Sequence, residues 1–521
     1  MTDSNDPSKG STDPWKKSGD AWDRSTNPWE QPVDPAPHVA AVGVPGAVAA
    51  QPGTVVDMVE PDEPGTSAKY SGGSKYRTYL FMYALASLGI FAIWGSMGGI
   101  ILPNHVQLIE FGNFFTGADA GVDLAALQNL KAAVEAGTAT PIAEEQRLLG
   151  LLAGFDAARA QGLATVTAVG VFVTMFIQPI VGVLSDRTRS PWGRRAPYVA
   201  AGTVLGALLL IALRYSTTIV LMAIFWSLAQ LIINVAQGPL TATVADRVVP
   251  EKIGSASAIS GLGLMAGAVL GSVAAGMLFG VMGLDAYYPF AIALAAGGIL
   301  FVLVCRDRSS QELDVEPLNL WRFILSFFIP LFDADYRWVW IAKIVMMFGY
   351  TVGTTFGFFM LQGYIQPALS PAEATATAPL LSLAGFPFML VAMVIAGRWS
   401  DRLMRRKPFV FWASIIAAAS YLVPIFWPAL PALFIQAIIG GAAMGTFLVV
   451  DQALFIDVIP DKRTAGRDLG MGALGGNLGQ ALGPIVGGWI VAWSGYQMVW
   501  IAAVAIVLVA AFAILPVKRA K

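Results

Sequence analysis

The 521-residue chain has little of what most enzymes and metalloproteins depend on. It contains one cysteine, Cys305, and two distant histidines, His38 and His105. One cysteine excludes a disulfide framework within the chain and a cysteine-based metal site. No GxxxxGK[ST] phosphate-binding loop and no Ser/His/Asp cluster stands out, which argues against ATP-driven pumping and against catalysis. We therefore expect no enzyme activity, no cofactor and no metal.

Charge is also scarce. Charged residues make up 13% of the chain, against about 25% in a typical soluble domain. The formal net charge of −1 excludes a chain built to bind polyanions, so we expect no nucleic-acid partner. Residues 1–76 lack an early apolar run, which argues against a signal peptide. Their polar, Pro/Gly/Ser-rich composition predicts a disordered cytoplasmic tail.

What is abundant is long apolar sequence: 56% of the residues are hydrophobic. A helix needs about 20 apolar residues to cross roughly 30 Å of hydrocarbon. Twelve runs approach this length: Arg77–Leu102, Leu163–Ser185, Pro197–Leu213, Thr217–Thr243, Ser255–Val281, Tyr287–Cys305, Trp338–Gln362, Ala378–Gly397, Pro408–Trp427, Leu430–Val450, Leu469–Val491 and Met498–Leu515. The sequence predicts an all-α polytopic membrane protein with twelve transmembrane helices.

Basic residues follow alternate runs. They are Arg187, Arg189, Arg194 and Arg195; Arg247 and Lys252; Arg402, Arg405, Arg406 and Lys407; Lys462, Arg463 and Arg467; and Lys518, Arg519 and Lys521. Because basic loops stay in the cytoplasm, we expect a multi-pass protein of the cell's cytoplasmic (inner) membrane with both termini inside. Membrane lipid is then a partner, and we expect a monomer.

The chain repeats internally. GVLSDR at Gly182–Arg187 recurs as GRWSDR at Gly397–Arg402, and DRVVPEK at Asp246–Lys252 is echoed by DVIPDK at Asp457–Lys462. The repeats predict two six-helix bundles, residues 77–305 and 338–521, the second ending in a short basic tail. Parallel repeats of this kind are typical of secondary transporters, whose sites lie between the halves.

Two segments interrupt this pattern. A cytoplasmic connector, 306–337, contains an apolar stretch, Leu318–Leu331, that is too short to span and predicts an amphipathic surface helix. An extracytoplasmic insertion, 103–161, shows helical spacing at Asp123–Ala136 and Ala143–Ala160. It is either a surface cap or a lid. The pair Asn104-His105 closes the first run, and we expect a solvated loop histidine there.

The loop after the second run resembles a known family. Gly182-x-x-Ser185-Asp186-Arg187 followed by Gly193-Arg194-Arg195 is similar to the loop signature of the major facilitator superfamily. The longer form SDRTRSPWGRRAPY resembles the glycoside–pentoside–hexuronide and sucrose-type cation symporters. The resemblance covers roughly residues 77–516. It implies the major facilitator fold, with twelve helices in two six-helix pseudo-repeats.

The fourth run extends this resemblance and also departs from it. Asn234-Val-Ala-Gln237-Gly238-Pro239, ending in Ala245-Asp246, is like the sucrose-type fourth helix. Sucrose-type proteins place an arginine two residues after the Gly-Pro, where this chain has Thr241. If that arginine holds substrate or drives proton coupling, this chain does so by other residues.

The resemblance also implies a cytoplasmic gate. In the family, the aspartate that matches Asp186 lies near the start of the eleventh helix, so the loop would hold the two halves together on the inside. The gate candidates are Gly182, Asp186, Arg187, Arg194, Arg195, Asp246, Asp401, Arg402 and Asp457. We expect Gly182 to let the second helix approach a neighbour. Glycines at small-xxx-small spacing, Gly263/Gly267/Gly271 and Gly475/Gly479/Gly483, would let the halves rock against each other.

Charges within the runs are functional candidates because burying them in a bilayer costs several kcal/mol. Lys343 lies about one and a half turns into the seventh span. Asp451 lies about one and a half turns before the cytoplasmic end of the tenth span, which stops near Asp457, so the two residues are at similar depth. We predict that they face each other, and that a proton or sodium ion competing for Asp451 couples to the conformation. The alternative is that both are near-surface residues.

Amides and aromatic rings could hold a polyhydroxylated ligand, since amides donate and accept and rings pack against sugar C–H faces. The substrate-binding candidates are Trp94, Trp226, Gln230, Asn234, Gln237, Tyr350, Asn477 and Gln480. For each, the alternative is ordinary helix packing or interhelical hydrogen bonding.

The sequence thus predicts a secondary active transporter that works by alternating access, as a cation-coupled symporter of a sugar or glycoside. A proton-coupled efflux antiporter of apolar compounds is the alternative within transport. A non-transporting membrane sensor or scaffold is the alternative from another class.

Overall fold

The computed structural model describes residues 58–59, 65–175, 177–314, 325–460 and 465–519. The described residues belong to one compact unit, Val55–Lys521. Most of the predicted tail and much of the predicted amphipathic helix Leu318–Leu331 lie outside them. Residues 65–76, which the sequence places in the tail, carry a short strand and the start of the first helix.

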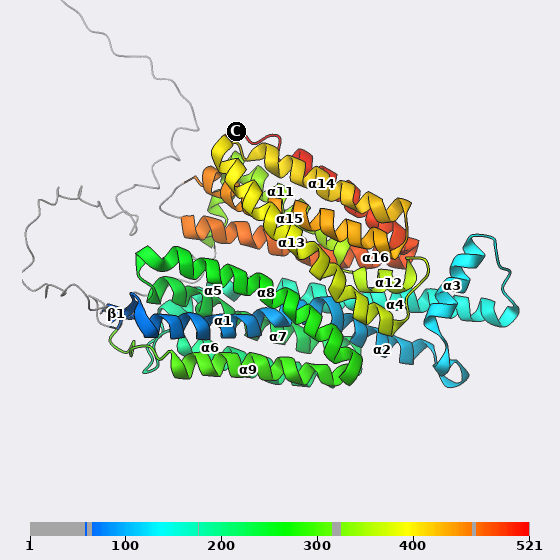
Figure 1. The fold of residues 1–521 in the computed structure, drawn as a ribbon, viewed down its shortest axis with the longest axis horizontal. Helices are drawn as coiled ribbons and strands as arrows, with labels where there is room; N and C mark the ends of the chain where they lie inside the picture. The colour runs from blue at the N-terminus through cyan, green and yellow to red at the C-terminus, as the bar shows by residue number, and fades with distance from the viewer. Residues whose placement is uncertain (1–57, 60–64, 176, 315–324, 461–464, 520–521) are drawn as a thin grey trace, which may run out of the picture. The chain divides into compact units, whose positions relative to one another are not determined.

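The structure is built almost entirely of helices (Figure 1). The elements are β1 (Met58–Val59), β2 (Lys69–Tyr70), α1 (Gly73–Ser96), the π-helix η2 (Met97–Ile101), α2 (Leu102–Phe114), η3 (Gly117–Gly121), α3 (Leu124–Glu135), α4 (Ala143–Thr174), α5 (Ile177–Asp186), α6 (Ala196–Arg214), α7 (Ile219–Arg247), α8 (Pro250–Met282), η4 (Gly283–Ala286), α9 (Tyr287–Val304), η5 (Ile329–Phe332), α11 (Ala334–Thr354), α12 (Gly357–Gly363), α13 (Pro371–Leu403), α14 (Lys407–Phe426), α15 (Leu430–Val458) and α16 (Ala465–Ala513). β1 and β2 pair antiparallel.

Nine helical stretches among the described residues are long and apolar enough to cross a membrane. Two of them each hold two expected spans: Gly263–Val304 covers the fifth and sixth, and Arg467–Ala513 covers the eleventh and twelfth. The last two spans are separated only by a kink at Gly495, whose φ is 75°. The second expected span falls on the end of α4 and on α5. The prediction of an all-α polytopic membrane fold is confirmed.

The helices pack in two groups, which we call the N-terminal set (α1 to α9) and the C-terminal set (α11 to α16). In the first set α1 packs on α8 and α9, α6 on α7 and α9, and α4 on α7. In the second, α11 packs on α16, α13 on α15, and α14 on both α15 and α16. The sets meet chiefly where α4 contacts α16 and α8 contacts α13.

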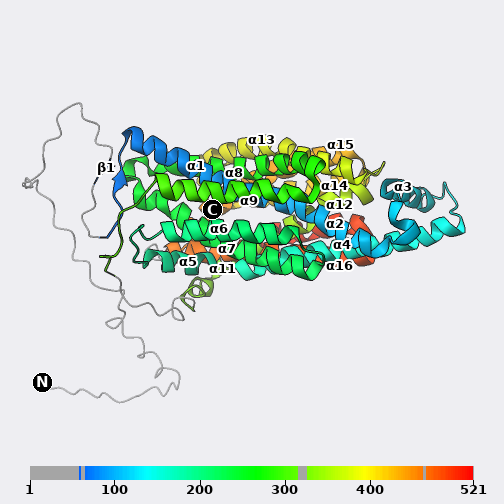
Figure 2. The same cartoon turned by 90° about the horizontal axis from the view of Figure 1, so that it is seen from below.

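Two ends of this helical unit matter below. The basic end carries the turns α5–α6, α7–α8 and α13–α14; the insertion end carries α2 and α3. In Figures 1 and 2, α3 lies at the end of the helices opposite β1. At the insertion end Gly276 of α8 packs against Thr375 and Pro379 of α13. Gly488 of α16 packs there against Ala160 and Ala164 of α4.

The predicted glycine stripes do allow close approach, but within each set. A Cβ on Gly267 or Gly271 would meet Phe91 and the backbone of Ala92 on α1. Gly475, Gly479 and Gly483 similarly face Trp340, Ile344, Met347 and Thr351 of α11. These stripes therefore tighten α1 on α8 and α11 on α16. That they let the halves rock against each other stays a prediction.

The insertion is more integrated than a surface loop. The predicted helix Asp123–Ala136 is observed as α3, capped by the Asp123 carboxylate, which accepts from the Ala125 and Ala126 amides. The predicted helix Ala143–Ala160 is the first half of α4 and continues into the second span. The first run also continues, through η2 into α2, so His105 is not a solvated loop residue. It is 1% exposed and bonds Tyr287 Oη and the Ser216 carbonyl.

Candidate functional site

Lys343 of α11 and Asp451 of α15 lie together inside the C-terminal set. Lys343 Nζ is 2.9 Å from Asp451 Oδ2, and the two side chains are 14% and 4% exposed. The ammonium also lies 4.8 Å from the centre of the Phe455 ring. The structure thus brings together the two charges that the sequence placed at similar depth, and it does not leave them as near-surface residues.

Small residues make room for this pair. A Cβ on Gly476 of α16 would lie 3.3 Å from Lys343 Cε, and one on Gly472 would lie 3.2 Å from the Phe455 ring. The lysine stem therefore runs between α11 and α16 toward α15. Because each charge offsets the other's desolvation, neutralising one leaves its partner buried without compensation. The site can therefore respond to a proton or cation that competes for the carboxylate.

A second candidate group lies in the N-terminal set, between α1 and α7. Trp94 Nε1 donates to Gln237 Oε1 at 3.0 Å. The Trp94 ring meets the Trp226 ring edge-on, with centroids 6.0 Å apart. Trp226 is 3% exposed, so it supports Trp94 rather than offering a free face. Gln237 and Trp94 are half-buried and remain the better candidates to touch a ligand.

The other amides of α7 are tied to neighbours. Gln178 of α5 donates to Asn234 Oδ1 at 2.6 Å, and Asn234 Nδ2 donates to the Gln230 carbonyl at 2.8 Å. Gln230 is 5% exposed and packs against Gly170 of α4. Interhelical hydrogen bonding therefore accounts for Asn234 in this structure. Thr241, where sucrose-type proteins have arginine, is exposed and bonds back to the Gln237 and Gly238 carbonyls.

One feature beside Trp94 is not among those predicted from the sequence. Residues Met97–Ile101 form a π-helix, and the Leu102 amide donates to the Met97 carbonyl five residues back. Such π-bulges are frequent at functional sites. The wider turn interrupts the regular hydrogen bonding of the α-helix and changes the direction of the groups next to it. Gly98 within it is exposed, with nothing within 4 Å of its Cβ position. The Gly98-Gly99 pair was the one available signal.

Three candidates belong to the C-terminal set: Tyr350 of α11, and Asn477 and Gln480 of α16. In the described part of the chain they make no hydrogen bond with the amides of the N-terminal set. Asn477 precedes Gly488 by about three helical turns and so lies near the same face of α16. Because Gly488 packs on α4, this face points toward the N-terminal set. Gln480 is exposed and Tyr350 is half-buried.

The gate candidates of the N-terminal set converge on Arg195. Its guanidinium pairs with Asp186, donates from Nε to Asp246 Oδ2 at 2.9 Å, and donates from Nη1 to Ser185 Oγ at 2.5 Å. Arg194 Nη2 lies 2.7 Å from Asp246 Oδ1. These contacts fasten the α5–α6 turn to the basic end of α7.

The repeat in the C-terminal set has the same construction. Arg406 lies 3.5 Å from Asp401 and 3.2 Å from Asp457, and it also donates to the Ala453 carbonyl. Arg195 and Arg406 thus occupy matching places, each between the aspartate of its SDR motif and the aspartate near the end of α7 or α15. The sequence repeat is a repeat of structure at this end.

Some gate expectations are not met in this structure. Asp186, the predicted link between halves, is paired with Arg195 of its own set. Nothing lies within 4 Å of a Cβ at Gly182, so the expectation of close helix approach there is wrong; its carbonyl accepts from Arg195 at 3.4 Å. Arg402 is exposed and Arg187 is half-buried. The gate role of these residues stays a prediction.

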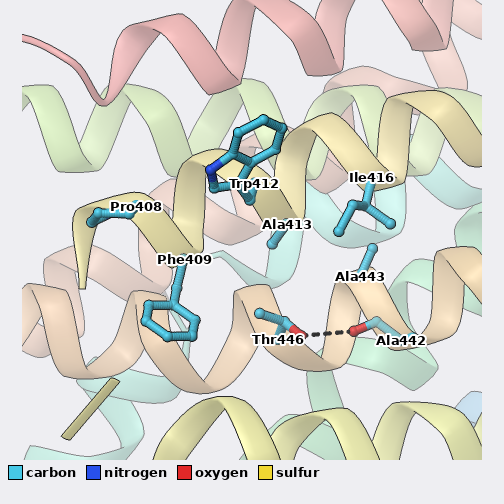
Figure 3. A pocket seen from close by; sticks show the side chains of 8 residues that line it. All are labelled: Pro408, Phe409, Trp412, Ala413, Ile416, Ala442, Ala443 and Thr446. Atoms are coloured by element: carbon cyan, nitrogen blue, oxygen red, sulfur yellow. Dashed lines mark hydrogen bonds between the residues drawn. The ribbon is translucent and has the colours of Figure 1, made fainter. Parts of the chain in front are cut away.

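A pocket of about 290 Å³ lies elsewhere, between α14 and α15 (Figure 3). It is lined by Pro408, Phe409, Trp412, Ala413, Ile416, Ala442, Ala443 and Thr446. The one hydroxyl, on Thr446, donates to the Ala442 carbonyl. None of the candidate site residues lines this pocket. Its apolar walls suit lipid contact better than a sugar.

Comparisons with known proteins agree with this geometry. Residues 339–521 match the family model of the Major Facilitator Superfamily. Sucrose transport protein SUT4 of Oryza sativa subsp. indica is 29% identical over 32% of this chain and 33% of its own length. Sucrose transport protein SUT1 of Oryza sativa subsp. japonica is 31% identical over 20% of this chain and 23% of its own. The chain thus spans about a third or less of the length of these curated relatives.

Solved structures extend the likeness to the whole fold. The nucleoside transporter NupG aligns with a TM-score of 0.61 at 14% identity, over 85% of this chain and 100% of its own. A bacterial homologue of the lysosomal transporter Spinster, in an inward-facing and occupied conformation, aligns at 0.59 and 13% identity, over 86% and 98%. At these identities the likeness concerns the fold. The expected resemblance to the superfamily is confirmed, and the matched proteins are transporters rather than enzymes.

Proposed function

Because the chain has the fold of a major facilitator superfamily transporter, we propose that it is a secondary active transporter that takes up a sugar or glycoside together with a cation. The basic end is the cytoplasmic end, following the positive-inside rule. The two sets of helices alternate between openings at the basic end and at the insertion end, with the substrate bound between them.

The observation that carries the coupling is the buried Lys343–Asp451 pair. A cation-coupled transporter needs a group whose protonation or cation binding changes the balance between two conformations. An inert scaffold has no use for an acid that is 3% exposed within a membrane-spanning helix. Lys343 stabilises the charged carboxylate at 2.9 Å, and an incoming proton or cation displaces that contact.

The sugar assignment is supported by the sucrose transport proteins among the relatives and by the site chemistry. Trp94 offers a half-buried ring beside the Gln237 amide, whose Nε2 makes no hydrogen bond in the described part of the chain. Asn477 faces this side from α16. An aromatic platform with amides on both sides suits a ring-shaped polyol.

The test is Asp451→Asn in liposomes that contain the purified full chain. We expect the wild-type protein to accumulate labelled sucrose inside the liposomes, driven by a proton or sodium ion that moves down its imposed gradient. Asp451→Asn should lower accumulation at least tenfold while sucrose counterflow is kept, since exchange needs no net cation movement. The matched control is Gln452→Ala, an exposed neighbour on α15, which should leave both rates unchanged.

Three outcomes would contradict parts of this proposal. Full accumulation by Asp451→Asn removes the coupling role. Extrusion of an apolar cationic dye without sugar flux favours an efflux antiporter. The absence of flux of any tested solute, with either a proton or a sodium gradient imposed, favours a sensor or scaffold.

A further inference from the structure

Arg159 of α4 is a buried cation that the proposed substrate and coupling sites do not use. It is 1% exposed and lies at the insertion end, where the two sets meet. From the N-terminal set it bonds Gln107 Oε1 at 3.1 Å and Asp156 Oδ1 at 2.8 Å. From the C-terminal set it meets Gln362 Oε1 at 3.4 Å and the Phe359 ring, 4.8 Å from its centroid. Arg159 therefore joins the two sets.

The charge of this arginine is balanced within its own helix. Asp156 lies three residues earlier on α4, and Gln128 Nε2 donates to each of its carboxylate oxygens at 3.0 Å. Lys131 of α3 also lies 3.7 Å from Asp156 Oδ2, so the carboxylate and both of its cations belong to the N-terminal set. In the described part of the chain, the partners from the C-terminal set, Gln362 and Phe359, are neutral. If the sets part, no charge loses its counter-ion, and water replaces the bonds to Gln362 and the ring. The contact is therefore built to break and re-form, unlike a salt bridge divided between the sets.

The insertion adds a second connection beside it. Helix α3 is held to α4 by Gln128, and the next residue, Asn129, accepts from the Ala368 amide of the C-terminal set at 2.9 Å. Gly363 closes over the cluster: a Cβ there would lie 3.1 Å from the Tyr496 ring and 3.2 Å from Arg159 Nη2. A third bond, from Thr375 to Asn104 Oδ1 at 3.2 Å, lies at the same end.

We propose that Arg159, Gln128 and Asn129, with Gln362, Gly363 and Ala368 opposite, form a latch that holds the insertion end closed and is released when that end opens. We call it the insertion-end latch. Helix α3 contributes Gln128 and Asn129 to this latch, so the insertion is a gating element rather than a surface cap. The latch rests on the proposed alternating access, but its test reads a distance and needs no substrate.

The experiment measures the separation of two spin labels on the full chain in lipid nanodiscs. Cys305→Ala removes the chain's single thiol; Thr217→Cys and Ala372→Cys then place one exposed label on each set at the insertion end. Arg159→Gln should at least double the fraction of long distances relative to the labelled parent. The double variant Asn129→Ala/Gln362→Leu should do the same, and it leaves the Arg159–Asp156 pair intact if Arg159→Gln does not fold.

Arg147→Gln is the matched control. It removes an arginine of the same helix whose partners are Asp119 and Glu144, both in the insertion, so its distance distribution should equal the parent's. An unchanged distribution in the folded double variant overturns the latch, whatever the sugar flux. Longer distances in a protein without flux support the latch and contradict the transport proposal alone.

Discussion

Lys343 and Asp451 show that the surroundings of a buried charged residue decide whether the fold tolerates it. Either charge alone would be strongly destabilising where they lie, and only the 2.9 Å contact makes both tolerable. The same holds for Arg159 with Asp156. In both pairs the cation also lies against an aromatic ring of another helix, Phe455 in one case and Phe359 in the other.

A pH effect belongs to the exposed charges of the insertion. Arg147 donates to Asp119 at 2.9 Å and to Glu144 at 3.0 Å, and these bonds lower the pKa of both carboxyls. Since the folded pKa values lie below the unfolded ones, near 4, the stabilisation is complete above that pH and is lost as pH falls through the folded values. We expect the protection factor of the Val122 amide, which bonds the Asp119 carbonyl, to fall severalfold in acid.

Hydrogen exchange followed by mass spectrometry checks this prediction. The variant Arg147→Ala should show low protection of the same segment at every pH, because its carboxyls have no partner to lose. A protection factor that depends equally on pH in wild type and variant would show that other groups hold the segment.

At the scale of the residue, sequence reasoning succeeded where charge stood against an apolar background. Lys343 and Asp451 were conspicuous in their runs. Arg159 and Asp156 are not singled out in the same way, because polar residues between apolar ones at helical spacing also fit the polar face of an amphipathic helix. They in fact share one stripe with Leu152, Phe155 and Leu163, all buried. A charge on the apolar stripe of a helix was the signal that could have revealed them.

At the scale of the element, glycine spacing predicts close packing but not the partner helix. Gly271 meets the backbone of Ala92, so any Cβ there forces α1 and α8 apart. A Cβ on Gly280, about two and a half turns later on the same helix, would have nothing within 4 Å. The two positions differ in surroundings and not in helix type.

This contrast predicts opposite results for one substitution. Gly271→Ala should destabilise the protein by about 1–3 kcal/mol through overpacking. Gly280→Ala should be neutral or stabilising by up to about 1 kcal/mol, because alanine favours helix. Thermal unfolding of both variants in the same detergent measures this. Equal melting temperatures would show that α1 and α8 adjust without strain.

At the scale of the whole molecule, run lengths and repeats were enough to predict twelve spans and a fold. They could not predict which side chains cross between the sets, because those contacts join residues such as Arg159 and Gln362 that are 203 positions apart. Nor could they show that α2 and α4 extend the first two spans into the insertion. No local pattern encodes such pairings.

The two arginines at the basic end allow a comparison between the sets. Asp246 is 14% exposed and serves Arg194 and Arg195, whereas Asp457 is 42% exposed and serves Arg406. Asp246→Asn leaves a 7% exposed arginine with weaker compensation, so we expect a loss of about 2 kcal/mol or more. Asp457→Asn should cost less than about 1 kcal/mol. The melting temperatures of the two variants test this prediction. An equal loss in both, or a larger loss in Asp457→Asn, would contradict the difference in burial between the two aspartates.

The ion pairs of Arg195 and of Arg406, each with two aspartates, have a mechanical consequence. Each set carries its own fastening across its turns, which makes that end stiff, while the described bonds between the sets gather at the insertion end. The N-terminal and C-terminal sets then move most easily as two stiff bodies, with the bending at the contact between them. A helix such as α7, with 29 residues, is about 44 Å long. If such a helix tilts by roughly ten degrees about one end, its other end moves by about 8 Å. A few side chains at the contact between the sets can therefore control a large movement at the opposite end.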